Sequence, residues 1–175
     1  MALDIVYWPD PVLTRPASPV GSVDEELRSV VAAMRRVMFR LKGVGLAAPQ
    51  VGVGRRVMLV CPSGAPGDEE VVVDPEILER HGEVEGDEGC LSLPGLYGPV
   101  VRAERIRVRA LDRDGQVFER EVDGLLAVCI QHEIDHLDGK LFVDYLSNLK
   151  RQRIRKKLEK EARQGGERAQ SQRAI

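Results

Sequence analysis

Residues 131–139 read QHEIDHLDG, and they contain two of the three histidines in the chain. On an α-helix, residues four apart lie on one face about a turn from each other, so His132 and His136 are placed to bind one metal ion. Glu133 lies ~100° round the helix from His132, beside such an ion rather than on it. A carboxylate there can exchange protons with an activated water. The stretch predicts a metal-binding helix, which we expect to span about Leu125 to Asp138.

The segments around this helix predict short antiparallel strands and two further helices. Residues 22–41 have a helical spacing of apolar residues, with Ser22 and Glu25 spaced as in a capping box and Gly43 placed to end the helix. Runs rich in β-branched residues predict strands at 56–61 and 70–74. Alternation around Asp114-Gly115 predicts a hairpin, and a basic helix is predicted over 148–163. The expected fold class is α+β, with antiparallel strands wrapped around a central helix that carries HExxH, and a C-terminal helix.

A catalytic metal site needs a third protein ligand and an open fourth position. Cys90 lies in the glycine-punctuated segment EGCLS, where irregular backbone can present a thiolate. His81 lies in a polar stretch, so we expect it to face solvent. Cys129 lies three residues before His132 on nearly the same helix face, and adding it would make a closed structural zinc site. Because Cys129 lies in an apolar run, we favour a core position for it and Cys90 as the ligand.

The segment GVGLAAPQ at residues 43–50 offers a different kind of group. Its two glycines allow the backbone to come close to a neighbour, and the Gln50 amide can donate a hydrogen bond to an oxyanion. A helix stop followed by a small-residue turn explains the same letters. Because the segment contains no titratable group, it does not by itself indicate catalysis.

Together, GVGLAAPQ, EGCLS and QHEIDHLDG resemble the three signature motifs of the peptide deformylase family, in the same order. The resemblance includes PDPVL, ALDRDG and LFVDYLS and spans most of residues 4–160. It implies a metal-dependent hydrolase that removes the formyl group from N-terminal formyl-methionine of newly synthesised polypeptides and releases formate. It also implies one bound ion, commonly Fe²⁺, with Zn²⁺, Ni²⁺ or Co²⁺ able to substitute.

Carried over by motif position, the resemblance assigns the metal ligands and the catalytic groups. The implied ligands are Cys90, His132 and His136. The implied catalytic groups are Glu133 as acid/base, with Gln50 and the backbone N–H of Leu91 holding the oxyanion. The sequence departs from many bacterial relatives soon after CLS, where it has Leu96-Tyr97-Gly98 instead of a basic residue. In this respect it is similar to the organellar and cyanobacterial branch.

Helix geometry suggests a pocket for the methionine side chain. Three residues share the helix face of His132. They lie seven, four and three positions before it and are Leu125, Val128 and Cys129. Together with the glycine-rich segment they could line an apolar pocket, or they could simply pack the core. The candidate pocket residues are Val44, Gly45, Leu125, Val128 and Cys129.

Two other classes of function fit parts of the sequence. HExxH also serves metallopeptidases that cut internal peptide bonds, which need room on both sides of the bond. A non-enzymatic structural-zinc module could use Cys129 as a fourth ligand and bind nucleic acid through the basic tail. A cleft would favour the first, and a four-ligand site the second.

Composition points to a cytoplasmic protein. Hydrophobic residues make up 43% of the chain and charged residues 31%, as in an ordinary globular domain. No apolar run resembles a signal peptide or is long enough to span a bilayer, so no membrane association is expected. Three cysteines form an odd and sparse set, which suits a reducing compartment.

The net charge of −2 conceals an asymmetry. From Asn148 onward there are ten Lys or Arg and three Glu, a local charge of +7, whereas the rest of the chain carries −9. Charge runs are usually solvated faces, but a basic helix on a deformylase-like chain also predicts docking on ribosomal RNA. We expect one catalytic domain over 1–164, including this helix, and a disordered tail over 165–175.

Overall fold

The computed structural model describes residues 1–164, so the tail predicted for 165–175 lies outside the described residues. Within them the chain forms three α-helices, seven strands and three short 3-10 helices. The helices are α1 (Glu25–Arg40), α2 (Gly124–Leu137) and α3 (Asn148–Arg163), and the 3-10 helices are η1 (Pro11–Thr14), η2 (Ala48–Val51) and η3 (Phe142–Tyr145). The strands are β1 (Gly45–Ala47), β2 (Val57–Val60), β3 (Glu70–His81), β4 (Val84–Cys90), β5 (Leu93–Arg102), β6 (Arg105–Leu111) and β7 (Val117–Asp123).

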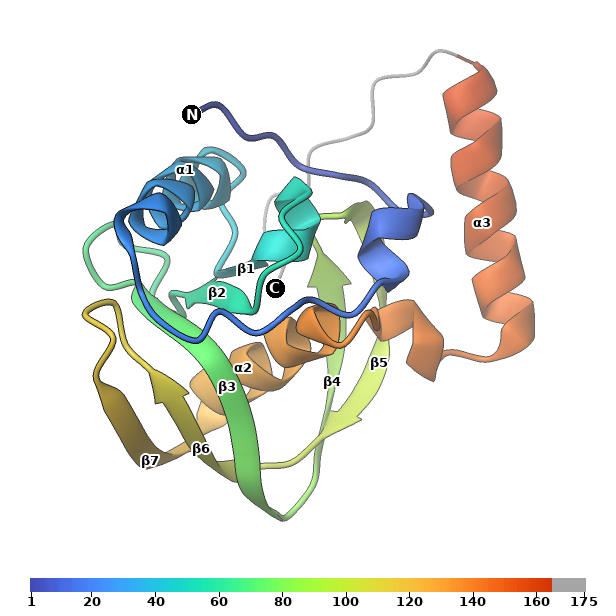
Figure 1. The fold of residues 1–175 in the computed structure, drawn as a ribbon. Coiled ribbons are helices and arrows are strands. Elements are labelled where there is room, and N and C mark those ends of the chain that lie inside the picture. The colour runs from blue at the N-terminus through green and yellow to red at the C-terminus, as the bar shows by residue number, and fades with distance from the viewer. Residues whose placement is uncertain (165–175) are drawn as a thin grey trace.

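The strands form two antiparallel sheets around α2. The larger sheet has the order β1-β2-β3-β6-β7, and the smaller one pairs β4 with β5. Figure 1 shows α2 in the middle of the molecule, between β3, β6 and β7 on one side and β4 and β5 on the other. The predicted α+β class, with strands wrapped around a central helix, is confirmed. Among the described residues no helix has both the length and the apolar character needed to cross a membrane.

Strand β2 shows how the larger sheet is held between two helices. All four of its residues are buried, and successive side chains point to opposite faces. Val57 and Leu59 pack in the cluster that contains the apolar face of α1. Met58 and Val60 pack in the cluster that contains α2. The sheet therefore fixes α2 from one side while α1 covers the other.

The ends of α1 differ from the expectation. The side chain of Asp24, not Ser22, caps the helix, because its Oδ1 accepts a hydrogen bond from the Leu27 backbone N–H at 2.8 Å. The chain leaves the helix through Lys42, which has a φ of 56°, so the stop comes one residue before Gly43. The capping-box prediction was wrong because Asp24 lies next to the first turn and Ser22 does not.

Strand β3 runs to His81, well past the predicted end at Asp74. Asp74 has a φ of 49° and marks a bulge, and its carboxylate accepts hydrogen bonds from the backbone N–H groups of Val20 and Gly21. Those bonds hold the irregular residue inside the strand, so pairing with β6 resumes beyond it. Strands β4 and β5 were not predicted either, and the expected irregular backbone around Cys90 is the end of β4.

Helix α3 has the predicted bounds. It stands at the edge of the molecule in Figure 1. Leu158 is buried, and Ile154 is packed against the same cluster, which also contains Trp8, Leu13 and Cys90. Leu149 is exposed. The helix is therefore anchored to the body through its middle turns.

Candidate metal centre

Three donor atoms converge where the end of β4 meets α2. The Sγ of Cys90 lies 3.3 Å from Nε2 of His136, which lies 3.2 Å from Nε2 of His132. The three ligand atoms lie within 4.8 Å of one another, and all three side chains are buried. In the part of the chain that the structure describes, this is the only such group of His, Cys, Asp or Glu.

The chemistry of these donors fits one divalent metal ion. Burial, followed by the charges of His132 and Arg102, lowers the pKa of His136 well below its usual value, so its imidazole is neutral and can bind a metal. Burial raises the pKa of the Cys90 thiol, so a thiolate at this position requires a neighbouring cation. Two imidazoles and one thiolate suit Fe²⁺ or Zn²⁺, and three protein ligands leave a position for water or substrate.

His132 is oriented by a buried ion pair that the sequence analysis did not identify. Its Nδ1 lies 2.8 Å from Oε2 of Glu88, so Nδ1 donates and Nε2 faces the other donors. Arg102 donates to both carboxylate oxygens of Glu88, at 2.7 and 2.8 Å. Burial alone raises the pKa of Glu88, but the hydrogen bonds from Arg102 and His132 outweigh it and lower the pKa to about 2. The ionised carboxylate therefore fixes the tautomer and the ring direction of His132.

The sequence does contain a signal for this pair. Glu88 opens the EGCLS motif, and a histidine ligand usually donates its second ring nitrogen to a carboxylate or carbonyl. Arg102 follows the apolar pair Val100 and Val101, and a buried charge needs a partner. No spacing rule links residues this far apart in the chain, so the partners become evident only in the fold.

Glu133 lies fully buried beside the donors. Neither of its carboxylate oxygens has a hydrogen-bond partner among the described residues. Burial, followed by the charge of Glu88, raises the pKa of Glu133 well above its usual value. A Cβ added at Gly45 would clash with Oε1 of Glu133, so this glycine makes room for the carboxylate. A buried carboxyl group whose two oxygens have no partner within residues 1–164 is placed to exchange a proton with a group bound beside it.

The segment GVGLAAPQ closes the site from the side of β1. A Cβ at Gly43 would lie 2.6 Å from Cδ1 of Leu91, so close approach at both glycines is confirmed. Gln50 is fully buried, and its Oε1 accepts from the backbone N–H of Ala47 at 2.9 Å. Its Nε2 lies 3.3 Å from Oγ of Ser92 and 3.4 Å from Sγ of Cys90. The Gln50 N–H₂ is therefore directed toward the donor cluster.

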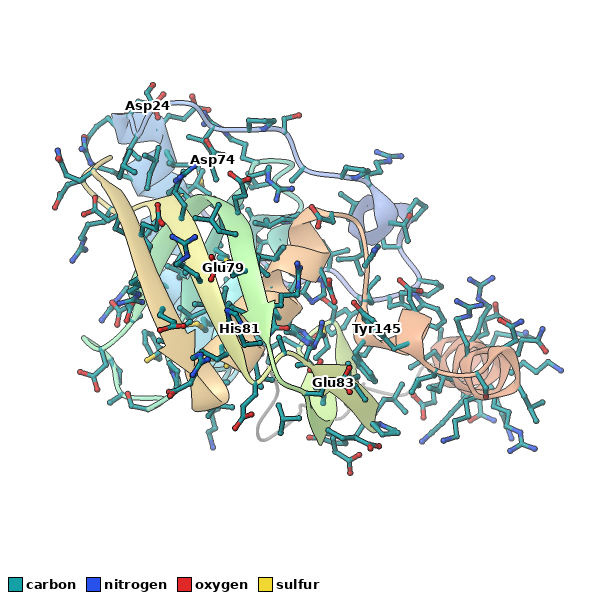
Figure 2. All side chains as sticks on the ribbon, turned by 90° about the horizontal axis from the view of Figure 1, so that it is seen from below. Asp24, Asp74, Glu79, His81, Glu83 and Tyr145 are labelled. Atoms are coloured by element: carbon teal, nitrogen blue, oxygen red, sulfur yellow. The ribbon has the colours of Figure 1, made fainter. Side chains whose placement is uncertain are left out.

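The remaining candidates lie in different surroundings. His81 is half-exposed on β3 and beside Glu79, as both labelled side chains in Figure 2 show, so the predicted solvent-facing position is confirmed. Cys129 is fully buried in the core around α2 and is not in the donor group of the described residues, which agrees with its predicted core position. Val44 and Val128 are partly buried, whereas Leu125 is 50% exposed. The methionine pocket stays a prediction.

Comparisons with known proteins identify the family of this chain. A family model described as polypeptide deformylase matches residues 2–152. The peptide deformylase of Alkalilimnicola ehrlichii is 57% identical over 165 residues, which cover 93% of this chain and 92% of that protein. A crystal structure of a peptide deformylase from Legionella pneumophila is 50% identical, covers 94% of this chain and 98% of that one, and superposes with a TM-score of 0.88.

A third relative is the peptide deformylase of Ehrlichia chaffeensis, whose crystal structure was determined in complex with actinonin. It is 38% identical, with a TM-score of 0.86 and coverage of 91% of this chain and 97% of that one. The family match includes all three donor residues and Glu133. The chain therefore belongs to the polypeptide deformylase family, the hydrolases that remove N-terminal formyl groups from nascent polypeptides.

Proposed function

We propose that the chain deformylates formyl-methionine termini with one divalent ion, ferrous iron in the cell, held by Cys90, His132 and His136. The observation that carries the proposal is the convergence of their three donor atoms within 4.8 Å beside a buried carboxylate without a partner among the described residues. When bound, such an ion supplies Lewis acidity, which lowers the pKa of a water and polarises a carbonyl.

Glu133 performs the proton transfers in this proposal. It accepts the proton of the water whose oxygen attacks the formyl carbon, and it returns that proton to the amine nitrogen as the C–N bond breaks. The products are formate and a free N-terminal methionine. Its two oxygens, which have no partner in the described part of the chain, support this role, because both remain available to water and substrate.

Gln50 and the backbone N–H of Leu91 stabilise the negative charge that develops on the formyl oxygen. The support for Gln50 is its orientation, since the bond from Ala47 to Oε1 leaves Nε2 facing the donors. A donor held in advance costs no reorganisation during the reaction, which makes it effective. The methionine side chain occupies the predicted apolar pocket. Its proposed lining residues are Val44, Gly45, Leu125, Val128 and Cys129.

The test is formate release by the iron- or nickel-loaded chain, under anaerobic conditions, from formyl-Met-Ala-Ser. We expect one formate for each free amine and no cleavage of the Met-Ala or Ala-Ser bonds. Acetyl-Met-Ala-Ser is the matched control. A loaded chain that cut internal bonds, or released no formate, would refute the proposed reaction. Actinonin, which is bound in the Ehrlichia chaffeensis structure, should inhibit formate release and raise the melting temperature.

We also propose that α3 docks the enzyme on ribosomal RNA in the cytoplasm. Five of its cations have no ion-pair or hydrogen-bond partner from a side chain in residues 1–164 and are exposed: Lys150, Arg153, Lys156, Lys157 and Lys160. Unpaired cations on one helix suit a surface of phosphates, and binding of this kind weakens steeply with salt.

Deleting α3 is a poor test, because Ile154 and Leu158 pack against the cluster that contains Cys90. The sharper test changes the five cations to Gln and keeps the apolar anchor. Ribosome co-sedimentation at moderate salt should be lost while formate release stays within about twofold. The control changes an equal number of exposed cations elsewhere: Arg15, Lys42, Arg80, Arg113 and Lys140. Equal loss of ribosome binding in both variants would contradict docking through α3.

A further inference from the structure

The ion pair behind His132 continues outward to a side chain at the surface. Nη1 of Arg102 donates to Oδ2 of Asp135 at 2.6 Å, and the hydroxyl of Tyr145 donates to the same oxygen at 2.7 Å. The guanidinium carbon of Arg102 also lies 5.0 Å from the centre of the Tyr145 ring. One tyrosine therefore contacts both charged groups of the outer layer, through its hydroxyl and through its ring face.

We propose that Tyr145 is a positioning residue for His132, acting through Asp135, Arg102 and Glu88. The inference rests on the proposed function, because the group finally held in place is a proposed metal ligand. Tyr145 touches neither the donor atoms nor Glu133. It sets the direction of the guanidinium, which sets the Glu88 carboxylate and with it the His132 ring.

The surroundings of the ion pair explain why such a residue is needed. A polar cavity of about 500 Å³ lies outside the network and is lined by Arg102, Asp135 and Tyr145, among other residues. Arg102 and Glu88 are nearly inaccessible, with exposed side-chain fractions of 6% and 2%. Buried charges interact strongly only while water stays away from them. The Tyr145 ring lies against the guanidinium and lines the same cavity.

The hydroxyl of Tyr145 is a reliable donor. Burial, followed by the hydrogen bond to Asp135, raises the pKa of Tyr145 to about 12, so the phenol stays protonated at physiological pH. Oδ2 of Asp135 thus accepts from both Tyr145 and Nη1 of Arg102, while Arg102 donates to the two oxygens of Glu88 through Nε and Nη2.

The backbone holds Tyr145 in place although 48% of the residue is exposed. It is the last residue of η3, and Phe142 and Val143 of that turn are buried in the cluster that contains Cys90. Figure 2 shows Tyr145 on the segment between α2 and α3. The same packing that fixes one proposed ligand thus fixes the residue that orients another.

The chain contains a matched control on β7. Arg120 pairs with Glu70 and stacks on Phe118, with 5.4 Å between its guanidinium carbon and the ring centre. This cluster repeats the arrangement of an arginine, a carboxylate and an aromatic ring, but it contacts no donor residue. Phe118→Leu therefore reports what the loss of an arginine–aromatic contact does to the fold alone.

The experiment measures Co²⁺ affinity by chelator competition, the visible Co²⁺ spectrum at saturation, kcat, KM and melting temperature. The variants are Tyr145→Phe, Tyr145→Leu, Asp135→Asn, the Tyr145→Phe/Asp135→Asn pair and Phe118→Leu. We expect roughly tenfold weaker Co²⁺ binding for Tyr145→Phe. This is the low end of the loss in metal affinity that follows when a hydrogen-bond partner behind a metal ligand is removed. We expect a larger loss for Tyr145→Leu. The spectrum should change and kcat should fall at saturating metal with KM unchanged. The double variant should bind Co²⁺ no more weakly than the more severely affected single variant, because both substitutions act on one path.

Unchanged Co²⁺ affinity and spectrum in Tyr145→Phe and Tyr145→Leu would overturn the proposal, whatever happens to melting temperature. Equal losses in Phe118→Leu would also overturn it, because the effect would then come from general destabilisation. The proposed function fails in a different way: the wild-type chain would bind no Co²⁺, or His132→Ala would bind it equally well.

Discussion

Helices α2 and α3 are similar in length, but they are built for different tasks. Nine of the 14 residues of α2 are buried, whereas Leu158 is the one buried residue among the 16 of α3. In α2 the side chains of His132 and Asp135 are held by partners from other elements. In α3 most cations have none among the described residues. We infer that α2 carries chemistry that needs fixed geometry, whereas the docking proposed for α3 needs only charge.

The strongest test of this contrast removes a proposed ligand. Cys90→Ala should abolish metal binding and reduce formate release to background, because two imidazoles alone hold the ion poorly. Metal content per chain is the measurement. Cys61→Ala is the matched control, since Cys61 is also a buried free cysteine. If Cys90→Ala keeps a full complement of metal, the donor set must be different.

Next in size is the loss of the proton acceptor. Glu133→Gln keeps the shape of the side chain but cannot take a proton, so kcat should fall by roughly 10²–10⁴-fold while the metal remains bound. Parallel measurements of kcat and metal stoichiometry check this. Loss of the metal together with activity would mean that Glu133 acts on the ion itself.

Breaking the ion pair behind His132 should have smaller effects, one on the stability of the fold and one on metal affinity. Arg102→Met leaves Glu88 buried without its main partner, which should lower the free energy of unfolding by about 3–5 kcal/mol. The freed carboxylate should also hold His132 less firmly, for a loss of about 10–100-fold in metal affinity. Denaturant unfolding and chelator competition measure the two effects. A stable variant with unchanged metal affinity would show that the pair is dispensable.

The smallest effect is expected on α3. Its ion pair between Arg163 and Glu159 spans 3.9 Å at the surface. Glu159→Gln should change the free energy of unfolding by less than about 1 kcal/mol and leave formate release unchanged, because exposed pairs are screened by water. A destabilisation comparable to that of Arg102→Met would erase the distinction between the two helices.

The two helices were predicted well, and for opposite reasons. The apolar run before His132 and the glycine after it gave the ends of α2 to within one residue, and the run of basic residues gave those of α3. The motifs also identified three residues whose donor atoms lie together in the fold, because EGCLS contains a thiol and HExxH contains two imidazoles. Local sequence signals were sufficient for features that lie within one continuous segment of the chain.

Strands β4 and β5 escaped prediction because their sequence does not have the usual strand composition. Glycines interrupt β4 and β5, and one has a physical reason: a Cβ at Gly89 would lie 2.6 Å from the Tyr97 ring. The Glu88–Arg102 pair was missed for a related reason, because it joins these two strands. Contacts between segments far apart in sequence leave no periodic pattern that sequence analysis could detect.

The central claim is that one ion is held by Cys90, His132 and His136, with Glu133 beside it. Anomalous diffraction from crystals of the metal-loaded chain, collected at the absorption edge of the metal, tests this most directly. The account predicts a single peak about 2.0–2.3 Å from the Sγ and the two Nε2 atoms, with no bond from Glu133. A peak bonded to Cys129 or Glu133, or no peak between β4 and α2, would contradict it.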